Sequence, residues 1–172
     1  MFEEVKLGAG RLHALLEFTY SYLQTSGSHM MSDRVATVRP VEESEATGMV
    51  AQVFDDIRRV KKIDRVPNFW RVLATNPAQL ELTWSRLKAI MHPEADGRTG
   101  HLDPLTREII AIAVSATNGC GYCINSHTTA AFKLGLTPEA LGELLAVVAL
   151  FNGTNALAEG YQIVPDVLPP QE

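Results

Sequence analysis

Residues 103–151 read DPLTREIIAIAVSATNGCGYCINSHTTAAFKLGLTPEALGELLAVVALF. Asp103-Pro104 and Thr137-Pro138 each place a side chain that can cap a helix directly before a proline. Proline at the first helical position loses no hydrogen bond, so each pair is typical of a helix start. Asn118-Gly119 is a turn signal, and Gly135 suits the position after a helix end. The stretch therefore predicts three consecutive helices, over about 104–117, 120–134 and from 138 onward.

The chain upstream of this stretch is also helical in pattern. Apolar residues recur every three or four positions from Gly48 onward, which predicts a helix there. A second helix is expected around Phe69–Leu73. Asn76-Pro77 marks the start of a third, which runs to Met91. Residues 32–46 and 92–101 are expected to form loops, and no segment shows strand alternation. The helix after Thr137 is apolar on most faces, which is typical of a helix buried in a core or a subunit interface. The fold class is predicted to be all-α.

The composition narrows the class of protein. The chain has 172 residues, and its net charge of −5 with no long basic run argues against a nucleic-acid partner. Its longest apolar runs, 109–116 and 144–151, are far short of the roughly 20 residues of a membrane span, so no membrane is expected. No secretion signal is evident, and two cysteines are too few for a secreted disulfide scaffold. The cytoplasm is therefore the expected compartment.

The first 31 residues are interpreted separately from the rest. Ser26-Gly27-Ser28-His29-Met30 resembles the scar of a cleavable tag, so residues 1–31 are expected to be an appended leader, with helical periodicity between Leu7 and Leu23. Residues 32–172 are expected to form a single helical domain whose core motif spans residues 100–151.

Cys120 and Cys123 carry the chemistry that the sequence favours. Residues three or four apart on a helix share a face, so the two sulfurs and the His127 imidazole form one stripe. The helix start offers free N–H groups and partial positive charge, which favour a reactive thiolate. A dithiol beside a proton carrier is what redox chemistry requires.

Glu108 is expected to join this stripe. It lies ten residues before Asn118, and His127 lies nine residues after it. If the two helices fold back at Asn118-Gly119, the constant rise of about 1.5 Å per residue brings Glu108 and His127 to nearly the same height. Cys123 then lies one turn nearer the bend. The sequence thus predicts a helical hairpin that carries Glu108, Cys120, Cys123 and His127 in one cluster.

Each of these residues also has a purely structural interpretation. The cysteines could be small core residues, His127 a structural histidine, and Glu108 a partner of Arg107 or a cap. Tyr122 is expected to have a role in packing or gating and not a catalytic role. A zinc site is disfavoured because the spacing lacks the two ligand pairs of structural zinc modules, so neither a metal nor a cofactor is expected.

The residues resemble a known family, the alkylhydroperoxidase D-like (AhpD-like) branch of the carboxymuconolactone decarboxylase superfamily. The matching pattern is Glu108, then C-x-x-C twelve residues on, then His127 four residues after Cys123, followed by AAFKLGLTPEAL. Pro67-Asn-Phe-Trp and Asn76-Pro-Ala-Gln-Leu resemble its peroxidase-related subgroup. Better-studied members carry histidine where this chain has Tyr122.

The resemblance implies a compact helical fold that assembles as trimers or hexamers, and a peroxidase that forms a disulfide. In such a mechanism Cys123 would be oxidised to a sulfenic acid, Cys120 would resolve it, and Glu108 with His127 would relay protons. A small hydroperoxide would be the substrate, and a dihydrolipoyl or thioredoxin-like dithiol protein would be the reductant. Physical reasoning alone leaves open that the sulfur nearer the amino end, Cys120, attacks first.

Two other functions remain open at this level. One is a lyase like the decarboxylases, with His127 and Glu108 as acid and base and no need for the cysteines. The other is a non-catalytic oligomer whose disulfide senses redox state by changing its packing.

Overall fold

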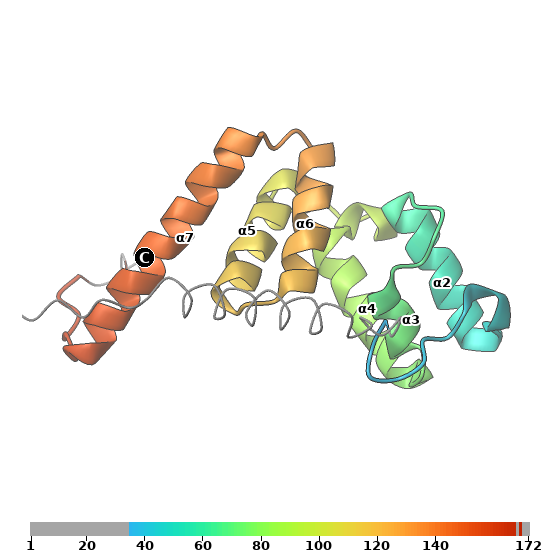
Figure 1. The fold of residues 1–172 in the computed structure, drawn as a ribbon. Coiled ribbons are helices and arrows are strands. Elements are labelled where there is room, and N and C mark those ends of the chain that lie inside the picture. The colour runs from blue at the N-terminus through green and yellow to red at the C-terminus, as the bar shows by residue number, and fades with distance from the viewer. Residues whose placement is uncertain (1–34, 168, 170–172) are drawn as a thin grey trace, which may run out of the picture. The chain divides into compact units, whose positions relative to one another are not determined.

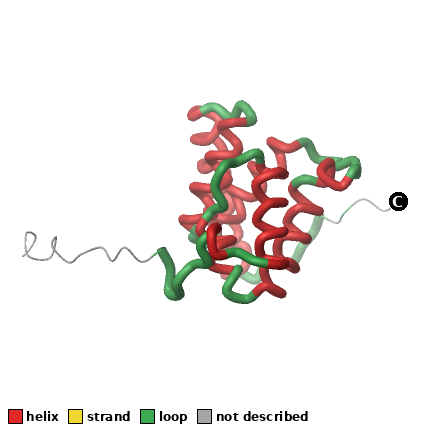
Figure 2. Tube along the Cα trace, turned by 90° about the vertical axis from the view of Figure 1, so that its right-hand side faces the viewer, coloured by secondary structure: helices red, strands yellow, loops and turns green. Residues whose placement is uncertain are grey.

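The computed structural model describes residues 35–167 and residue 169. This part of the chain forms helices and contains no strand (Figures 1 and 2), so the all-α prediction is confirmed. The expectations for residues 1–31 lie outside the described residues. The elements in chain order are η1 (Glu43–Glu45), α2 (Gly48–Lys61), α3 (Asn68–Leu73), α4 (Pro77–Met91), η2 (Pro93–Asp96), α5 (Pro104–Thr117), α6 (Gly121–Lys133) and α7 (Pro138–Gly160).

The three predicted capping residues each cap a helix. In every case the side-chain oxygen accepts a hydrogen bond from the backbone N–H three residues later, which satisfies a donor that the helix leaves free. The donor–acceptor distances are 3.3 Å from Gln79 to Asn76, 3.0 Å from Thr106 to Asp103 and 3.2 Å from Ala140 to Thr137. The helix starts that the sequence predicted at Pro77, Pro104 and Pro138 are confirmed.

The described chain divides between residues 82 and 83 into two compact units, 35–82 and 83–167. In the first, α2 and α3 bury an apolar core that includes Phe54, Ile57 and Val66. The buried Arg71 guanidinium forms an ion pair with Glu42, and the Arg71 carbonyl accepts the N–H of Val41, which ties the arm before α2 to α3. That residues 32–172 form a single domain stays a prediction.

The second unit is built on α5, which packs against both α6 and α7 (Figure 1). Its core consists of Ile112, Ala131 and Leu136, covered by the partly buried side chains Leu105, Ile109, Ala140, Leu141 and Leu144. Gly119 adopts the left-handed conformation (φ 70°) between α5 and α6, and Gly135 does so (φ 97°) between α6 and α7. Glycine has no Cβ to clash there, which explains why both sharp turns carry it.

Arg107 holds the segment between α4 and α5. Its guanidinium is buried and donates to the carbonyl oxygens of Met91 (3.1 Å) and Leu102 (2.7 Å). Residues 92–101 were expected to be a loop, and they contain the short helical turn η2. A Cβ added to Gly100 would lie 1.7 Å from the Arg107 Nη2 atom, so this segment approaches α5 too closely for a side chain at position 100.

Helix α7 differs from the sequence-based expectation. It is 23 residues long and has no buried residue within the chain, although an apolar helix of this kind was expected to be covered. By its length and composition, α7 would also be able to cross a membrane. Uncharged small and polar residues extend the apolar run 144–151 to a span of that length. Core helices of soluble proteins meet the same criterion.

Candidate redox site

Cys120 occupies the position just before α6 and is fixed there by backbone contacts. Its N–H donates to the Ser115 carbonyl at the end of α5 (2.9 Å), and its own carbonyl accepts the N–H of Ile124 (2.9 Å). The Sγ atom of Cys120 accepts the Cys123 N–H at 3.3 Å, so the sulfur takes the place of a helix cap. A negative charge on this sulfur would be stabilised by that N–H and by the positive end of the helix dipole.

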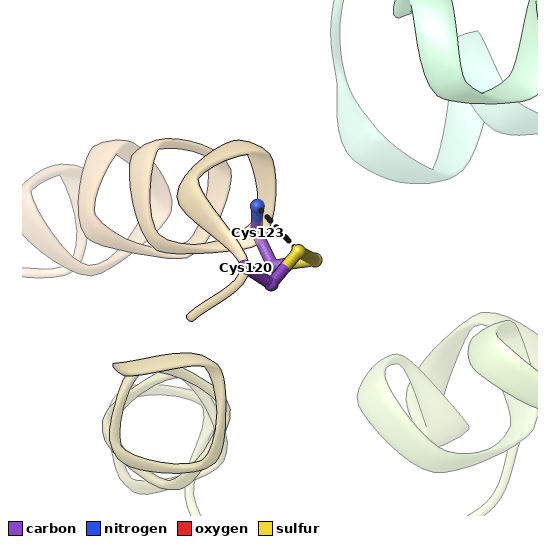
Figure 3. The surroundings of a disulfide bond; sticks show 2 residues. All are labelled: Cys120 and Cys123. Carbon is purple, nitrogen blue, oxygen red and sulfur yellow. Dashed lines mark hydrogen bonds between the residues drawn. A yellow bond between two sulfur atoms is a disulfide. The ribbon is translucent and has the colours of Figure 1, made fainter. Parts of the chain in front are cut away.

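Cys120 and Cys123 form a disulfide across the first turn of α6 (Figure 3). Their Cα atoms lie 5.3 Å apart, which is within the ordinary range for such a bond. Both residues are partly exposed, so solvent and small molecules have access to the pair. The disulfide is partly exposed, lies at a helix start and joins two cysteines with only two residues between them. A disulfide in this setting is suited to thiol–disulfide exchange.

Glu108 and His127 form the second pair of the site. The Nδ1 atom of His127 lies 2.7 Å from the Oε2 atom of Glu108, which joins the first half of α5 to the middle of α6. The two side chains are 10% and 23% exposed, so the contact is largely shielded from water. A ring that donates from Nδ1 to a carboxylate keeps its Nε2 atom available to exchange protons elsewhere.

The four predicted residues therefore lie on two neighbouring helices as two pairs. His127 joins the pairs, because it follows Cys123 by one helical turn and contacts Glu108 on α5. The structural interpretation of Glu108 as a partner of Arg107 is not what the contacts show, since Arg107 instead binds two backbone carbonyls and lies 3.6 Å from Glu94.

One residue of the site was not predicted from the sequence, and a second, Arg107, has a different role from the one considered. The backbone carbonyl of the buried Ser115 accepts a hydrogen bond from the N–H of Cys120 and thereby fixes the position of the first cysteine of the disulfide. Arg107 fixes the segment that precedes α5 next to Glu108. For Ser115 the available signal was a polar residue on the apolar side of a predicted helix, because buried polar groups need specific partners.

Tyr122, between the cysteines, exposes 48% of its surface. Elsewhere in the second unit, α5 and α7 enclose a groove of about 370 Å³, which none of the four predicted residues lines. Within the described part of the chain, no group of three or more histidine, cysteine, aspartate or glutamate side chains is arranged to hold a metal ion.

Comparisons with known proteins place this geometry in a family. The model of the carboxymuconolactone decarboxylase family matches residues 87–165, which include all four candidate residues. The crystal structure of the alkylhydroperoxidase AhpD core from Rhodospirillum rubrum is 45% identical and superposes with a TM-score of 0.71. That match covers 77% of this chain and 96% of the other. The chain belongs to the AhpD-like branch of the carboxymuconolactone decarboxylase family.

Curated relatives of this AhpD-like protein are more distant. An alkyl hydroperoxide reductase of Mycobacterium tuberculosis is 27% identical over 69% of this chain and 32% of its own length. Alkyl hydroperoxide reductase AhpD of Solibacter usitatus is 29% identical over 52% of this chain and 48% of its own length. The AhpD-like chain thus spans about a third of the first of these relatives and about half of the second.

Proposed function

We propose that this AhpD-like protein is a thiol-dependent peroxidase, a disulfide oxidoreductase that reduces small hydroperoxides. The observation that carries the proposal is the Cys120–Cys123 disulfide at the start of α6, one turn from the shielded contact between His127 and Glu108. The pair of sulfurs supplies two electrons, and the pair of titratable side chains supplies the protons that the reaction moves.

The first step forms a sulfenic acid. The Cys123 thiolate attacks one oxygen of the hydroperoxide, the O–O bond breaks, and Cys123 becomes Cys–SOH. The departing alkoxide takes a proton from the relay of His127 and Glu108 and leaves as an alcohol. The sulfur loses two electrons, and the peroxide gains them.

The second step forms the disulfide. The Cys120 thiolate attacks the Cys123 sulfur, the S–O bond breaks, and the hydroxyl leaves as water after it accepts a proton from the same relay. An external dithiol then attacks the disulfide through a mixed disulfide and returns both cysteines to thiols. We propose a dihydrolipoyl or thioredoxin-like protein as this reductant, without a cofactor bound to the chain.

The proposal extends to the setting of the protein. We infer a homo-oligomer, trimeric or hexameric as the family resemblance implies, located in the cytoplasm. Curated relatives named as alkyl hydroperoxide reductases support a hydroperoxide as the substrate.

The decisive experiment compares three variants of the full chain with the wild type for peroxide consumption with a panel of dithiol reductants. Cys123→Ser is expected to abolish turnover. Cys120→Ser is expected to stop after the first step and to accumulate a sulfenic acid on Cys123 that dimedone traps. Ser126→Ala, an exposed side chain on the same helix, is the matched control and should keep full activity.

Two outcomes would contradict these assignments. If neither thiol of the reduced protein reacts with peroxide faster than free cysteine at neutral pH, the proposed peroxidase activity is wrong. If dimedone labels Cys120 in the Cys123→Ser variant, the roles of the two sulfurs are reversed. The hydrogen bond from the Cys123 N–H to the Cys120 sulfur makes the second result physically reasonable, which is why both single variants are needed.

A second function is favoured by one observation. The contact between Glu108 and His127 involves neither sulfur, and such a pair can act as acid and base in a lyase of the decarboxylase type. Activity on a carboxymuconolactone-like substrate that persists in Cys120→Ser/Cys123→Ser would identify the lyase.

A further inference from the structure

Ser115 is a buried polar residue to which the proposed reaction assigns no role. It exposes only 8% of its surface. Its carbonyl accepts the N–H of Cys120 at 2.9 Å, but its hydroxyl forms no hydrogen bond with any of the residues that the structure describes. A buried hydroxyl without a partner costs free energy, so its presence on a helix that faces the site calls for a function.

Ser115 lies on the side of α5 that meets α6. The buried residues of α5 include Glu108, Ile112 and Ser115, which follow one another at intervals of four and three. Such intervals keep three residues on one side of a helix. The first of them contacts His127 on α6, and the second packs in the core with Ala131 of the same helix. Ser115 occupies the next position along this side, toward the cysteines.

The turn between α5 and α6 brings Ser115 next to Cys120. Gly119 is left-handed, its N–H donates to the Ala116 carbonyl at 3.4 Å, and the Cys120 N–H donates to the Ser115 carbonyl at 2.9 Å. Two such bonds around a left-handed glycine form a Schellman motif, in which the side chains at the two ends of the longer loop are commonly in contact. In other proteins this contact is apolar. Here it pairs the Ser115 hydroxyl with the Cys120 sulfur.

A thiolate on Cys120 requires hydrogen-bond donors close by. The Cys123 N–H is one of them, at 3.3 Å from the Cys120 sulfur. The sequence contains no lysine or arginine between Glu108 and Lys133, so no cation on this part of α5 and α6 faces the sulfur. The His127 ring is held by Glu108. A serine hydroxyl can rotate toward a negative charge, and a hydrogen bond to a charged group is stronger than one between neutral groups.

We propose that the Ser115 hydroxyl donates a hydrogen bond to the Cys120 sulfur in the reduced protein and, together with the Cys123 N–H, holds this sulfur as a thiolate. This role rests on the proposed peroxidase, in which Cys120 attacks the oxidised Cys123 and later leaves the disulfide. A disulfide sulfur carries no charge and is a weak acceptor, which explains why the hydroxyl is without a partner among the described residues in the oxidised form.

This hydrogen bond also determines which sulfur leaves when the disulfide is reduced. A thiolate of the dithiol reductant attacks the Cys123 sulfur, the bond between Cys120 and Cys123 breaks, and its electron pair moves to Cys120. A thiolate of lower pKa leaves faster, so both donors accelerate this step. The second thiolate of the reductant then displaces Cys123 from the mixed disulfide. Cys123 takes up the electron pair and a proton, and the reductant becomes a disulfide.

The test measures the Cys120 thiol by itself. Full-length Cys123→Ser keeps the backbone N–H at position 123, and the rate at which iodoacetamide alkylates its Cys120 is followed from about pH 5 to pH 10. Addition of Ser115→Ala is expected to raise the pH midpoint by about one unit, which is a tenfold change in the acid dissociation constant. The exposed Ser126→Ala is the matched control and should leave the midpoint unchanged.

Two further measurements separate this role from a structural one. In Cys120→Ser, where Cys123 is the remaining thiol, Ser115→Ala should not move the midpoint of alkylation. Oxidised wild type that is treated with β-mercaptoethanol, quenched in acid and capped with N-ethylmaleimide should carry mercaptoethanol on Cys123 and maleimide on Cys120. Ser115→Ala should form this product severalfold more slowly. Its oxidised form should melt no lower than the wild type, because alanine is smaller and favours a helix.

Three results would overturn the proposal. They are an unchanged midpoint for Cys120 after Ser115→Ala, equal shifts for Cys120 and Cys123, and a mercaptoethanol adduct on Cys120. None of these measurements uses a peroxide, so failure here is distinguishable from failure of the proposed peroxidase. An unchanged midpoint with intact peroxide turnover removes Ser115 alone. A shifted midpoint in a protein that consumes no peroxide keeps the hydrogen bond from Ser115 and removes the peroxidase.

Discussion

The His127 imidazole and the Glu108 carboxylate are 2.7 Å apart although 19 positions separate them in the sequence. The contact crosses from α5 to α6 and lies where both side chains are mostly shielded from water. A carboxylate in this position orients the imidazole ring, as required of a residue that exchanges protons at a fixed place.

Glu108→Gln should therefore slow catalysis without displacing the ring. The amide can still accept a hydrogen bond from Nδ1, but it cannot take up a proton and so cannot take part in a proton relay. We expect kcat for peroxide reduction to fall by about 10²-fold, the typical contribution of a proton-transfer group, with little change in KM. The exposed Glu81→Gln is the control. An unchanged kcat would remove Glu108 from the relay.

Reduction of the disulfide should leave the helices intact. The bond closes a very short loop, so its removal is expected to lower the free energy of unfolding by about 2 kcal/mol. The start of α6 stays fixed in either state by the bonds from Cys120 to Ser115 and from Ile124 to Cys120. Circular dichroism should show the same helix content with and without reductant and a melting temperature lower by a few degrees.

The double variant Cys120→Ser/Cys123→Ser serves as the control for this measurement, because reductant should not change its melting temperature. A marked loss of helix content in the reduced wild type would instead point to the disulfide as a structural staple.

Protonation of Asp103 should weaken the start of α5. The hydrogen bonds from the Thr106 hydroxyl and N–H lower the pKa of Asp103 below the usual value of an aspartate. Because the folded pKa is lowered, the carboxylate stabilises the fold at pH values above the unfolded pKa, and this stabilisation is lost as the pH falls through the folded pKa.

Asp103→Asn keeps a capping oxygen but cannot titrate, so comparison of the two proteins isolates this effect. The melting temperature of the wild type should exceed that of Asp103→Asn near pH 6, and the difference should shrink below about pH 4. Glu81→Gln provides the baseline for acid denaturation. A difference that stays constant down to pH 2 would contradict the prediction.

Gly100→Ala should destabilise the second unit. The new Cβ would occupy the space of the Arg107 guanidinium, which is buried and donates to two carbonyl oxygens. We expect a loss of about 1–3 kcal/mol in the free energy of unfolding, measured in urea, as for other overpacked sites. Gly121→Ala meets no neighbouring atom and should be nearly neutral.

The helices were predictable because their ends carry strong local signals. Asp103 and Thr137 cap α5 and α7 through side chains that bond to their own following turn, and Gly119 and Gly135 take conformations that other residues avoid. Such signals act within a few residues of sequence, so they can be recognised without knowledge of the tertiary structure.

Other features depend on contacts that the sequence does not reveal. The burial of Arg107 depends on the carbonyl groups of Met91 and Leu102, which come close only once the chain has folded. The exposure of α7 was not predictable either, because an apolar helix looks the same in sequence whether its own chain or a second copy covers it.

The candidate residues all come from one segment of twenty amino acids, 108–127. Residues elsewhere in the described chain can affect them through the angle and spacing at which α5 and α6 pack. Ile112 and Ala131 fill the contact between these helices and have no exposed surface. A change of one methyl group at either position would therefore change the distance between the Glu108 and His127 side chains slightly. It would do so without changing either of the side chains that transfer the proton.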